Sequence, residues 1–235
     1  MTPSQLHPTP RSLGQSNVRF NQAQMIPAQQ ATSLKLTKST DYYEQRCVKY
    51  PDRASFHCYA EFIHALLLEA APEVTSFVPQ PYQLVVKGRL YTPDAYVVRS
   101  GRIQVLELKP GGKFDEQDEA LLVAFFEQYG MHFEVVANET VLAQEQLARN
   151  WLPLIQVLAQ AQAQGIETQI EEQQLFDAAR AHGDALTVGE LLTDAPRRDR
   201  YWQELALYRL LHRHDLKCNL GEAPLDYDKV ITAWS

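Results

Sequence analysis

The sequence has few cysteines and no long hydrophobic segment. Its three cysteines, Cys47, Cys58 and Cys218, are odd in number and scattered, which predicts free thiols in a reducing compartment and no disulfide framework. The longest apolar runs, such as Phe62–Leu68, are far too short to cross a bilayer. Met1–Leu6 lacks the basic-then-apolar order of a secretory signal. We therefore expect a cytoplasmic protein without a membrane segment.

Positive charge is also scarce. The chain has 22 Lys and Arg residues against 29 Asp and Glu residues, and its formal net charge is −7. A protein that binds DNA tightly by itself is usually basic, because phosphate contacts dominate affinity. This balance argues mildly against a free-standing DNA binder. It is compatible with carboxylates concentrated at a metal site, or with DNA affinity supplied largely by partner proteins.

Two regions precede the C-terminal part of the chain. Residues 1–30 are rich in Pro, Gln, Ser and Asn, with little apolar periodicity, which predicts a flexible or partner-ordered arm. Residues 31–165 alternate helical and extended patterns, which predicts an α/β domain with a mixed sheet flanked by helices. The expected elements are a helix at 59–70, strands at 74–78, 83–87, 95–98 and 103–108, a helix at 115–129, a strand at 132–136, and one or two helices within 144–164.

The last region, residues 166–235, has a different texture. Its first part is helical, and Thr187 and Glu190 are spaced as in a capping box that begins a short helix. A stronger helix and two extended segments follow. Three helices and a two-stranded wing describe a small winged helix-turn-helix domain. The expected elements lie at 170–180, 187–190, 201–212, 216–220 and 225–231.

A hairpin around Ser100-Gly101 gives the sharpest geometric prediction. If these two residues form the turn, antiparallel pairing gives partner numbers a constant sum, so that Asp94 faces Glu107. Directly opposed residues lie on one face of the sheet, with Cβ atoms roughly 4.5–5.5 Å apart. Two adjacent carboxylates repel unless a cation neutralises them. Strand periodicity places Lys109 on the same face, and a slip of one residue would undo the assignment.

These residue types together indicate metal-dependent phosphodiester chemistry. Asp94 and Glu107 are candidate ligands of Mg²⁺ or Mn²⁺, which prefer oxygen, and the backbone carbonyl of Leu108 is a candidate third ligand. Lys109 is expected to orient the attacking water or to stabilise the charge that grows on the phosphate. The ordinary alternative is that each residue is structural by itself. Their convergence, with Glu61 upstream at the start of a helix, favours the functional interpretation.

Pro93-Asp94 and Glu107-Leu108-Lys109, separated by twelve residues, resemble the PD-(D/E)xK restriction-endonuclease-like superfamily. A wider set of motifs is similar to the TnsA-type endonuclease subunits of heteromeric transposases, and this similarity covers about residues 30–235. The set comprises Ser33-Leu34-Lys35, the helix with Glu61, Val74–Pro81 with its Gln-Pro ending, Leu90–Asp94, Tyr129–Val136, and the stretch from Ala206 to Leu225, which is similar to the winged-helix half of such proteins.

The resemblance implies a restriction-endonuclease-like mixed sheet flanked by helices, followed by a small winged-helix C-terminal domain. It implies that Glu61 is the helix carboxylate that completes the site, Asp94 the central metal ligand and Lys109 the superfamily lysine. Glu107 fills a position where some relatives carry Gln. One departure is Cys58, which stands where a Ser usually precedes the helix carboxylate by three residues.

The implied activity is Mg²⁺-dependent cleavage of double-stranded DNA at transposon ends, on the non-transferred 5′ strand, with Mn²⁺ as a substitute. A DDE transposase subunit (TnsB-like) would cut and join the 3′ ends, and a regulatory ATPase (TnsC-like) would be the third partner. Two alternatives stay open. One is a stand-alone PD-(D/E)xK nuclease in restriction, repair or junction resolution. The other is a non-catalytic module that recruits the transposase or ATPase.

Two further features of the C-terminal region have competing interpretations. His212, His214 and Cys218 have a superficially metal-like spacing, but without a second cysteine pair we interpret them as surface histidines beside a buried cysteine. Basic residues around the strongest helix predict either a DNA-facing surface or a solvated or partner-contacting face. They are Arg197, Arg198, Arg200, Arg209, Arg213 and Lys217.

Overall fold

The computed structural model describes residues 17–21, 26–32, 37, 41–182, 186–192 and 196–233. They divide into two compact units. The first unit comprises Met1–Glu44, Ala54–Phe62 and Glu73–Leu142, and the second comprises Gln45–Arg53, Ile63–Pro72 and Ala143–Ser235. This division differs from the predicted one at residue 165, because the long helix that begins at residue 145 groups with the C-terminal residues.

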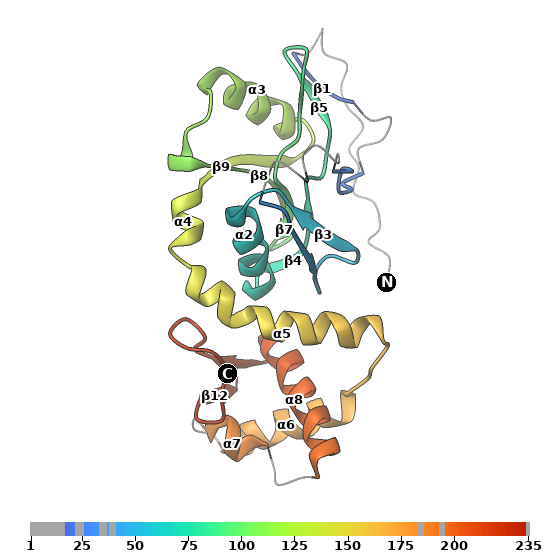
Figure 1. Cartoon of the computed structure of the whole chain (residues 1–235), viewed down its shortest axis with the longest axis vertical. Coiled ribbons are helices and arrows are strands. Elements are labelled where there is room, and N and C mark those ends of the chain that lie inside the picture. The colour runs from blue at the N-terminus through green and yellow to red at the C-terminus, as the bar shows by residue number, and fades with distance from the viewer. Residues whose placement is uncertain are drawn as a thin grey trace. The chain divides into compact units, whose positions relative to one another are not determined.

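A four-stranded mixed sheet forms the centre of the first unit (Figure 1). Its first three strands are antiparallel to one another, and the fourth is parallel to the third. A parallel neighbour requires a crossover connection, and helix α3 is part of it. In spatial order the strands are β4 (Val74–Pro79), β7 (Ala95–Arg99), β8 (Arg102–Lys109) and β9 (Met131–Ala137). The prediction of a mixed α/β fold is confirmed.

The hairpin of β7 and β8 has the predicted register. Arg99 pairs with Arg102, and Ala95 pairs with Leu106. The two turn residues both have positive φ, 48° for Ser100 and 74° for Gly101. Such a pair of left-handed residues is the two-residue turn whose twist matches that of the flanking strands. The turn therefore fixes the alignment of every later pair in the hairpin, including the carboxylate positions at its far end.

Helix α3 (Glu116–Glu127) covers the sheet beside β9 (Figure 1). Asp115 caps its N-terminus, accepting hydrogen bonds from the backbone N–H groups of Gln117 (3.1 Å) and Asp118 (2.9 Å). Its inner face buries aromatic side chains, and the rings of Phe126 and Phe133 stack with centroids 5.8 Å apart. Because these rings fill the space between the helix and the sheet, the end of β8 is held on a rigid support.

Strand β1 (Val18–Phe20) lies inside the segment predicted to be a flexible arm. It pairs with β5 (Leu84–Val86), which pairs in turn with β6 (Arg89–Tyr91). Val18 is only 2% exposed, and Phe20 packs edge-on against Tyr82 with ring centroids 5.1 Å apart. The prediction of an arm is wrong for these residues. Three residues of alternating burial are too few to give a periodic signal within a segment rich in Pro and Gln.

The remaining elements of this part of the chain are short, apart from one helix. Helix α2 spans Tyr59–Ala70, as predicted; it begins in the first unit and continues into the second. None of the helices in the described ranges has the length and apolar character that a membrane crossing requires. The short elements are β2 (Tyr43–Arg46), β3 (Arg53–Phe56), the 3-10 turn η1 (Pro110–Gly112) and α4 (Asn138–Leu142).

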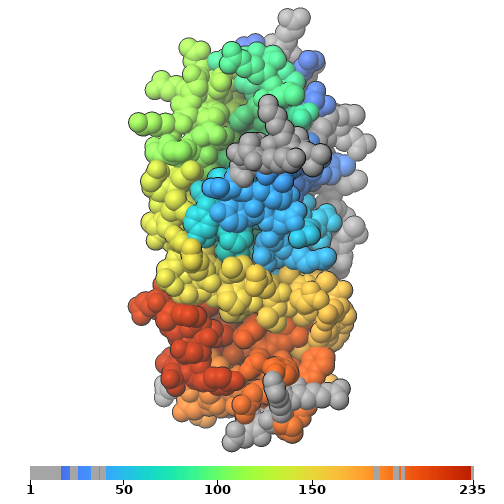
Figure 2. All heavy atoms as spheres, in the orientation of Figure 1, coloured from blue at the N-terminus to red at the C-terminus, as the bar shows by residue number. Residues whose placement is uncertain are grey.

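The second unit combines helices with a small antiparallel sheet of order β10-β12-β11. The capping box is confirmed. The side chain of Thr187 accepts from the backbone N–H of Glu190, and the side chain of Glu190 accepts from the backbone N–H of Thr187. The outer side of α5 lies on the face shown in Figure 2, in yellow. The elements are α5 (Glu145–Ala163), α6 (Gln169–His182), β10 (Leu186–Thr187), α7 (Val188–Leu191), α8 (Arg197–His212), β11 (Leu216–Cys218) and β12 (Val230–Ala233).

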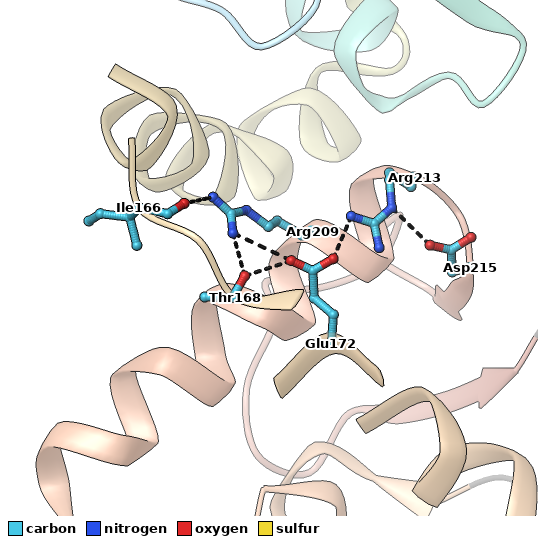
Figure 3. A network of polar contacts seen from close by, with 6 residues as sticks. All are labelled: Ile166, Thr168, Glu172, Arg209, Arg213 and Asp215. Atoms are coloured by element: carbon cyan, nitrogen blue, oxygen red, sulfur yellow. Dashed lines mark hydrogen bonds and ion pairs between the residues drawn. The ribbon is translucent and has the colours of Figure 1, made fainter. Parts of the chain in front are cut away.

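An ion cluster ties α8 to α6, and we call its charged residues Glu172, Arg209 and Arg213 the arginine cluster (Figure 3). Glu172 bonds Arg213 (2.7 Å) through one oxygen and pairs with Arg209 (3.4 Å) through the other. Arg209 also donates to the hydroxyl of Thr168 and to the carbonyl of Ile166. Of the six basic residues that the sequence left as either a DNA-facing or a solvated or partner-contacting face, Arg209 therefore turns inward, whereas Arg213 bonds Glu172 but stays 48% exposed. The side chains of Arg197 and Arg198 lie outside the described residues.

His212 is buried, so the prediction of a surface histidine is wrong for this residue. It is 8% exposed, and its Nε2 lies 2.8 Å from Oε2 of Glu69, which is fully buried. The other oxygen of Glu69 accepts from the backbone N–H groups of Val48 (2.9 Å) and Lys49 (2.8 Å). His212 thus hydrogen-bonds a buried carboxylate inside the second unit. A long-range partner of this kind leaves no trace in the local spacing of His and Cys.

Candidate active site

Asp94 stands one residue beyond the last paired position of the β7–β8 hairpin. Its backbone N–H donates to the carbonyl of Leu106 (3.0 Å), and its own carbonyl accepts from the N–H of Gln80 (2.9 Å). Oδ2 of its side chain accepts from the N–H of Leu108 (2.7 Å). Three hydrogen bonds to two neighbouring strands leave Asp94 little freedom. Both the backbone and the carboxylate of Asp94 therefore bond strand β8.

Glu107 follows on β8 and is 2% exposed. The phenol of Tyr91 donates to its Oε2 (2.5 Å), and the ammonium of Lys109 pairs with its Oε1. This pair confirms that Glu107 and Lys109 share a face of the strand. Nζ of Lys109 also lies 5.9 Å from the centroid of the Phe114 ring. Both oxygens of Glu107 therefore have a donor, and its carboxylate holds Lys109 in place.

Glu61 approaches from the first turn of α2. Its Oε2 accepts from the backbone N–H of His57 (3.1 Å) and from Nε2 of Gln80 (2.7 Å), while Sγ of Cys58 accepts from the N–H of Glu61 (3.5 Å). This pattern is close to a capping box, in which Ser or Thr usually supplies the first acceptor, but the Glu61 carboxylate accepts from the residue before the N-cap. The cysteine that departs from the family pattern thus occupies the helix-capping position, with sulfur in place of oxygen.

Hydrogen bonds link the three carboxylates: Gln80 bonds both the side chain of Glu61 and the backbone of Asp94, and Asp94 bonds the backbone next to Glu107. Burial, and then the charges of Glu107 and Glu61, raise the pKa of Asp94 well above its usual range, although Leu108 and Lys109 oppose this. Burial also raises the pKa of Glu107, the bonds from Lys109 and Tyr91 lower it, and the charge of Glu61 raises it further. We call Glu61, Asp94, Glu107 and Lys109 the carboxylate site.

The donor chemistry of the carboxylate site fits a hard cation, because every candidate ligand atom is an oxygen. Within the described ranges, Oδ2 of Asp94 accepts from Leu108, and Oε2 of Glu61 accepts from His57 and Gln80, while the Cys58 side chain also bonds Glu61. Within the same described ranges, no group of three or more His, Cys, Asp or Glu side chains is already arranged to hold a metal ion. Glu107 in particular is engaged by Tyr91 and Lys109.

Three residues of the site environment were not assigned a role from the sequence. Gln80 is 3% exposed and bonds both Glu61 and the backbone of Asp94. Tyr91 holds Glu107, and burial and the charge of Glu107 keep the pKa of its phenol far above its usual value. The Gln80-Pro81 and Tyr-x-Pro-Asp motifs contain Gln80 and Tyr91 and could have indicated these two residues. Gln29, which bonds Gln80, lies in the predicted arm and had no signal.

A cleft of about 490 Å³ lies beside the carboxylate site in the first unit. Tyr91 contributes to both, since its phenol bonds Glu107 while its side chain lines the cleft. Phe114, whose ring lies near Lys109, forms another part of the wall. The charged residues of the wall are balanced, because Lys87 and Arg89 are accompanied by Asp115 and Asp118, and Lys87 pairs with Asp118 (2.7 Å). The site therefore adjoins a space into which a larger substrate can extend.

A scan against protein-family models finds no match for the chain, and a search of the curated proteins finds none either. The resemblance to TnsA-type endonucleases therefore stays a prediction based on short motifs. One of those motifs, Ser33-Leu34-Lys35, lies outside the described residues.

Proposed function

We propose that the chain is a Mg²⁺-dependent DNA endonuclease whose active centre is the carboxylate site. The observation that carries this proposal is a set of contacts that links Glu61 of helix α2, through Gln80, to Asp94, and Asp94 to the strand that bears Glu107 and Lys109. Oδ1 of Asp94, Oε1 of Glu61 and the carbonyl oxygen of Leu108 are the atoms that would hold Mg²⁺ or Mn²⁺. A bound cation would lower the pKa of water and offset charge on the phosphate.

Lys109 acts on the substrate in this proposal, and Glu107 acts mainly through Lys109. The ammonium is close to the carboxylates and partly exposed, with 36% of the side-chain surface accessible. It is thus able to stabilise the negative charge that develops on a scissile phosphate. Glu107 would join the cation ligands only after Lys109 releases Oε1. A positioning role is also compatible with Gln at this place, which the resemblance implies for some relatives.

We further propose that the enzyme is the TnsA-type subunit of a heteromeric transposase and cuts the non-transferred 5′ strand at transposon ends. The second unit supports this, because its order of α6, β10, α7, α8, β11 and β12 is compatible with a winged helix. The net charge of −7 is also easier to reconcile with an enzyme that binds DNA together with partners. Those partners would be a DDE transposase and a regulatory ATPase.

Reconstituted cleavage of transposon ends tests this function. With the cognate transposase and Mg²⁺, Asp94→Ala should reduce 5′-strand cutting by about 10²–10³-fold, whereas 3′-strand cutting and joining persist. Strand mapping on end-labelled DNA measures both reactions. Glu116→Gln is the matched control, because Glu116 is an exposed carboxylate on α3 of the same unit. The control should cut both strands as the wild type does.

The outcomes separate the candidate functions. If Asp94→Ala leaves the product spectrum unchanged, the carboxylate site is not the active centre. If the purified chain cuts generic duplex DNA with Mg²⁺ alone, it is a stand-alone nuclease and the transposase assignment is wrong. If the wild type supports transposase assembly but never cuts DNA, the chain is a non-catalytic assembly module.

A further inference from the structure

A chain of amide hydrogen bonds leads from the N-terminal segment to Glu61, and we call it the amide relay. The backbone N–H of Ser55 donates to Oε1 of Gln29 (3.2 Å). Nε2 of Gln29 donates to the carbonyl of Ser55 (2.7 Å) and to Oε1 of Gln80 (2.6 Å). Nε2 of Gln80 then donates to Oε2 of Glu61 (2.7 Å). All four residues belong to the first unit.

The backbone of Ser55 fixes the direction of the relay. A backbone N–H only donates and a carbonyl only accepts, so Gln29 must turn its Oε1 to the N–H and its Nε2 to the carbonyl of Ser55. Gln29 therefore offers an N–H to Gln80. Gln80 accepts it with Oε1 and is left with its own Nε2 toward Glu61. The backbone of Ser55 thus determines which of the two possible orientations each side-chain amide of Gln29 and Gln80 adopts.

Gln80 is held in place by its backbone as well. Its N–H donates to the carbonyl of Asp94 (2.9 Å), and its carbonyl accepts from the N–H of Gln30 (3.0 Å). Its φ of 39° is in the left-handed region, which costs a non-glycine residue about 1 kcal/mol or more. Such a conformation persists only where the surroundings enforce it. The buried side chain of Gln80 therefore has a defined position between Asp94 and Glu61.

We propose that Gln29 and Gln80 are positioning residues that present Oε1 of Glu61 to a divalent cation. This inference rests on the proposed function, because the cation is the one expected at the carboxylate site. Oε2 of Glu61 is occupied by two N–H donors, Gln80 Nε2 and the backbone of His57. Neither of these two bonds involves Oε1, which is therefore the oxygen that the proposal assigns to the cation. Outer partners of this kind typically change metal affinity by about 10–100-fold when they are removed.

Two substitutions interrupt the relay in different ways. Gln80→Met removes the last donor at nearly constant volume. Gln29→Glu leaves Glu61 and Gln80 intact but reverses the relay, because a carboxylate at position 29 only accepts. Gln80 must then turn its Nε2 away and its Oε1 toward Glu61. Gln30→Glu is the matched control: it makes the same change of charge one residue further on, where the side chain bonds the carbonyl of Ala28 (2.7 Å).

Calorimetric titration of the full-length protein with Mn²⁺ alone measures the effect, and thermal unfolding monitors folding. Gln80→Met and Gln29→Glu should weaken Mn²⁺ binding by about 10–100-fold, and Gln30→Glu by no more than about twofold. Gln29 is only partly buried, so its substitution carries the test if Gln80→Met does not fold. Equal Mn²⁺ affinities for Gln29→Glu and Gln30→Glu would overturn the relay.

Failure of the relay and failure of the proposed function give different results. If Mn²⁺ binding follows the relay but the wild type cuts no DNA with its partners, the relay stands and the endonuclease proposal falls. If cutting depends on Asp94 but Gln29→Glu binds Mn²⁺ normally, only the relay falls. If the wild-type protein binds no Mn²⁺, both the positioning role of the amide relay and the proposed cation site are wrong.

Discussion

The carboxylate site of the first unit and the arginine cluster of the second place partly or fully buried acidic groups in opposite surroundings. Burial raises the pKa of Glu172, but bonds from Thr168 and Arg213 and the charges of the two arginines outweigh it, so the pKa is lowered. At the carboxylate site a single lysine faces three carboxylates, and the pKa of Asp94 is raised. The ionised form of Glu172 therefore stabilises the folded protein, whereas ionisation of Asp94 costs folding free energy at a candidate functional site.

The largest expected effect on stability is at the arginine cluster. Glu172→Gln should lower the free energy of unfolding by about 1.5–3 kcal/mol, because it weakens hydrogen bonds to charged groups and removes the carboxylate that pairs with Arg209, while Arg213 keeps Asp215. Chemical denaturation at pH 7 measures this change. Glu171→Gln, one residue earlier on α6, is the matched control. An equal loss in both variants would mean that the cluster contributes nothing specific.

The loss in Glu172→Gln should depend on pH. The folded pKa of Glu172 is below its unfolded value, so the ionised form stabilises the fold above the unfolded pKa. This contribution disappears as the pH falls through the folded pKa. The difference in stability between the wild type and Glu172→Gln should therefore shrink in acid.

Asp94→Asn should have the opposite sign in the metal-free protein. The folded pKa of Asp94 is raised, so its ionisation costs stability progressively as the pH rises from the unfolded pKa to the folded one. Asn keeps an acceptor for the N–H of Leu108 and removes the charge. We expect a gain of about 1 kcal/mol at neutral pH, and less in acid, by thermal unfolding in chelator. A loss of stability at every pH would show that the carboxylates are compensated.

Glu107→Gln should have the smallest effect and distinguishes the two roles of this residue. If Glu107 positions Lys109, the amide oxygen of Gln still accepts from the ammonium, and cleavage should fall by less than about tenfold with Mn²⁺ affinity nearly unchanged. Lys109→Met is the companion variant and should lose cleavage far more severely. A loss of Mn²⁺ affinity in Glu107→Gln as large as in Asp94→Asn would make Glu107 a metal ligand.

The hairpin that carries Asp94 and Glu107 was predictable because its geometry is local. Ser100-Gly101 specifies a two-residue turn, and the turn alone sets the pairing. Counting residues from the turn then brought Asp94 to the neighbourhood of Glu107. Helix α2 and strand β9 were predictable for a similar reason. The apolar residues of α2 repeat over more than one helical turn, and those of β9 repeat over more than one pair of strand residues.

The parts that sequence reasoning missed depend on contacts between distant residues. Gln29 reaches Gln80 across fifty-one positions, and His212 reaches Glu69 across 143. Neither residue stands in a pattern that anticipates its partner. Arg209 was grouped with a basic surface because composition shows charge and not direction. Its side chain turns inward to a carbonyl and a carboxylate of the same unit.

Strand β1 and Gln29 have a practical consequence for anyone who shortens this protein. A chain begun at residue 31, where the sequence first looks globular, would lack Val18 and Phe20 from the aromatic core and Gln29 from the relay. Such a fragment would expose an unpaired edge of β5, and unpaired edges invite aggregation. Domain boundaries for expression therefore have to be placed ahead of residue 17.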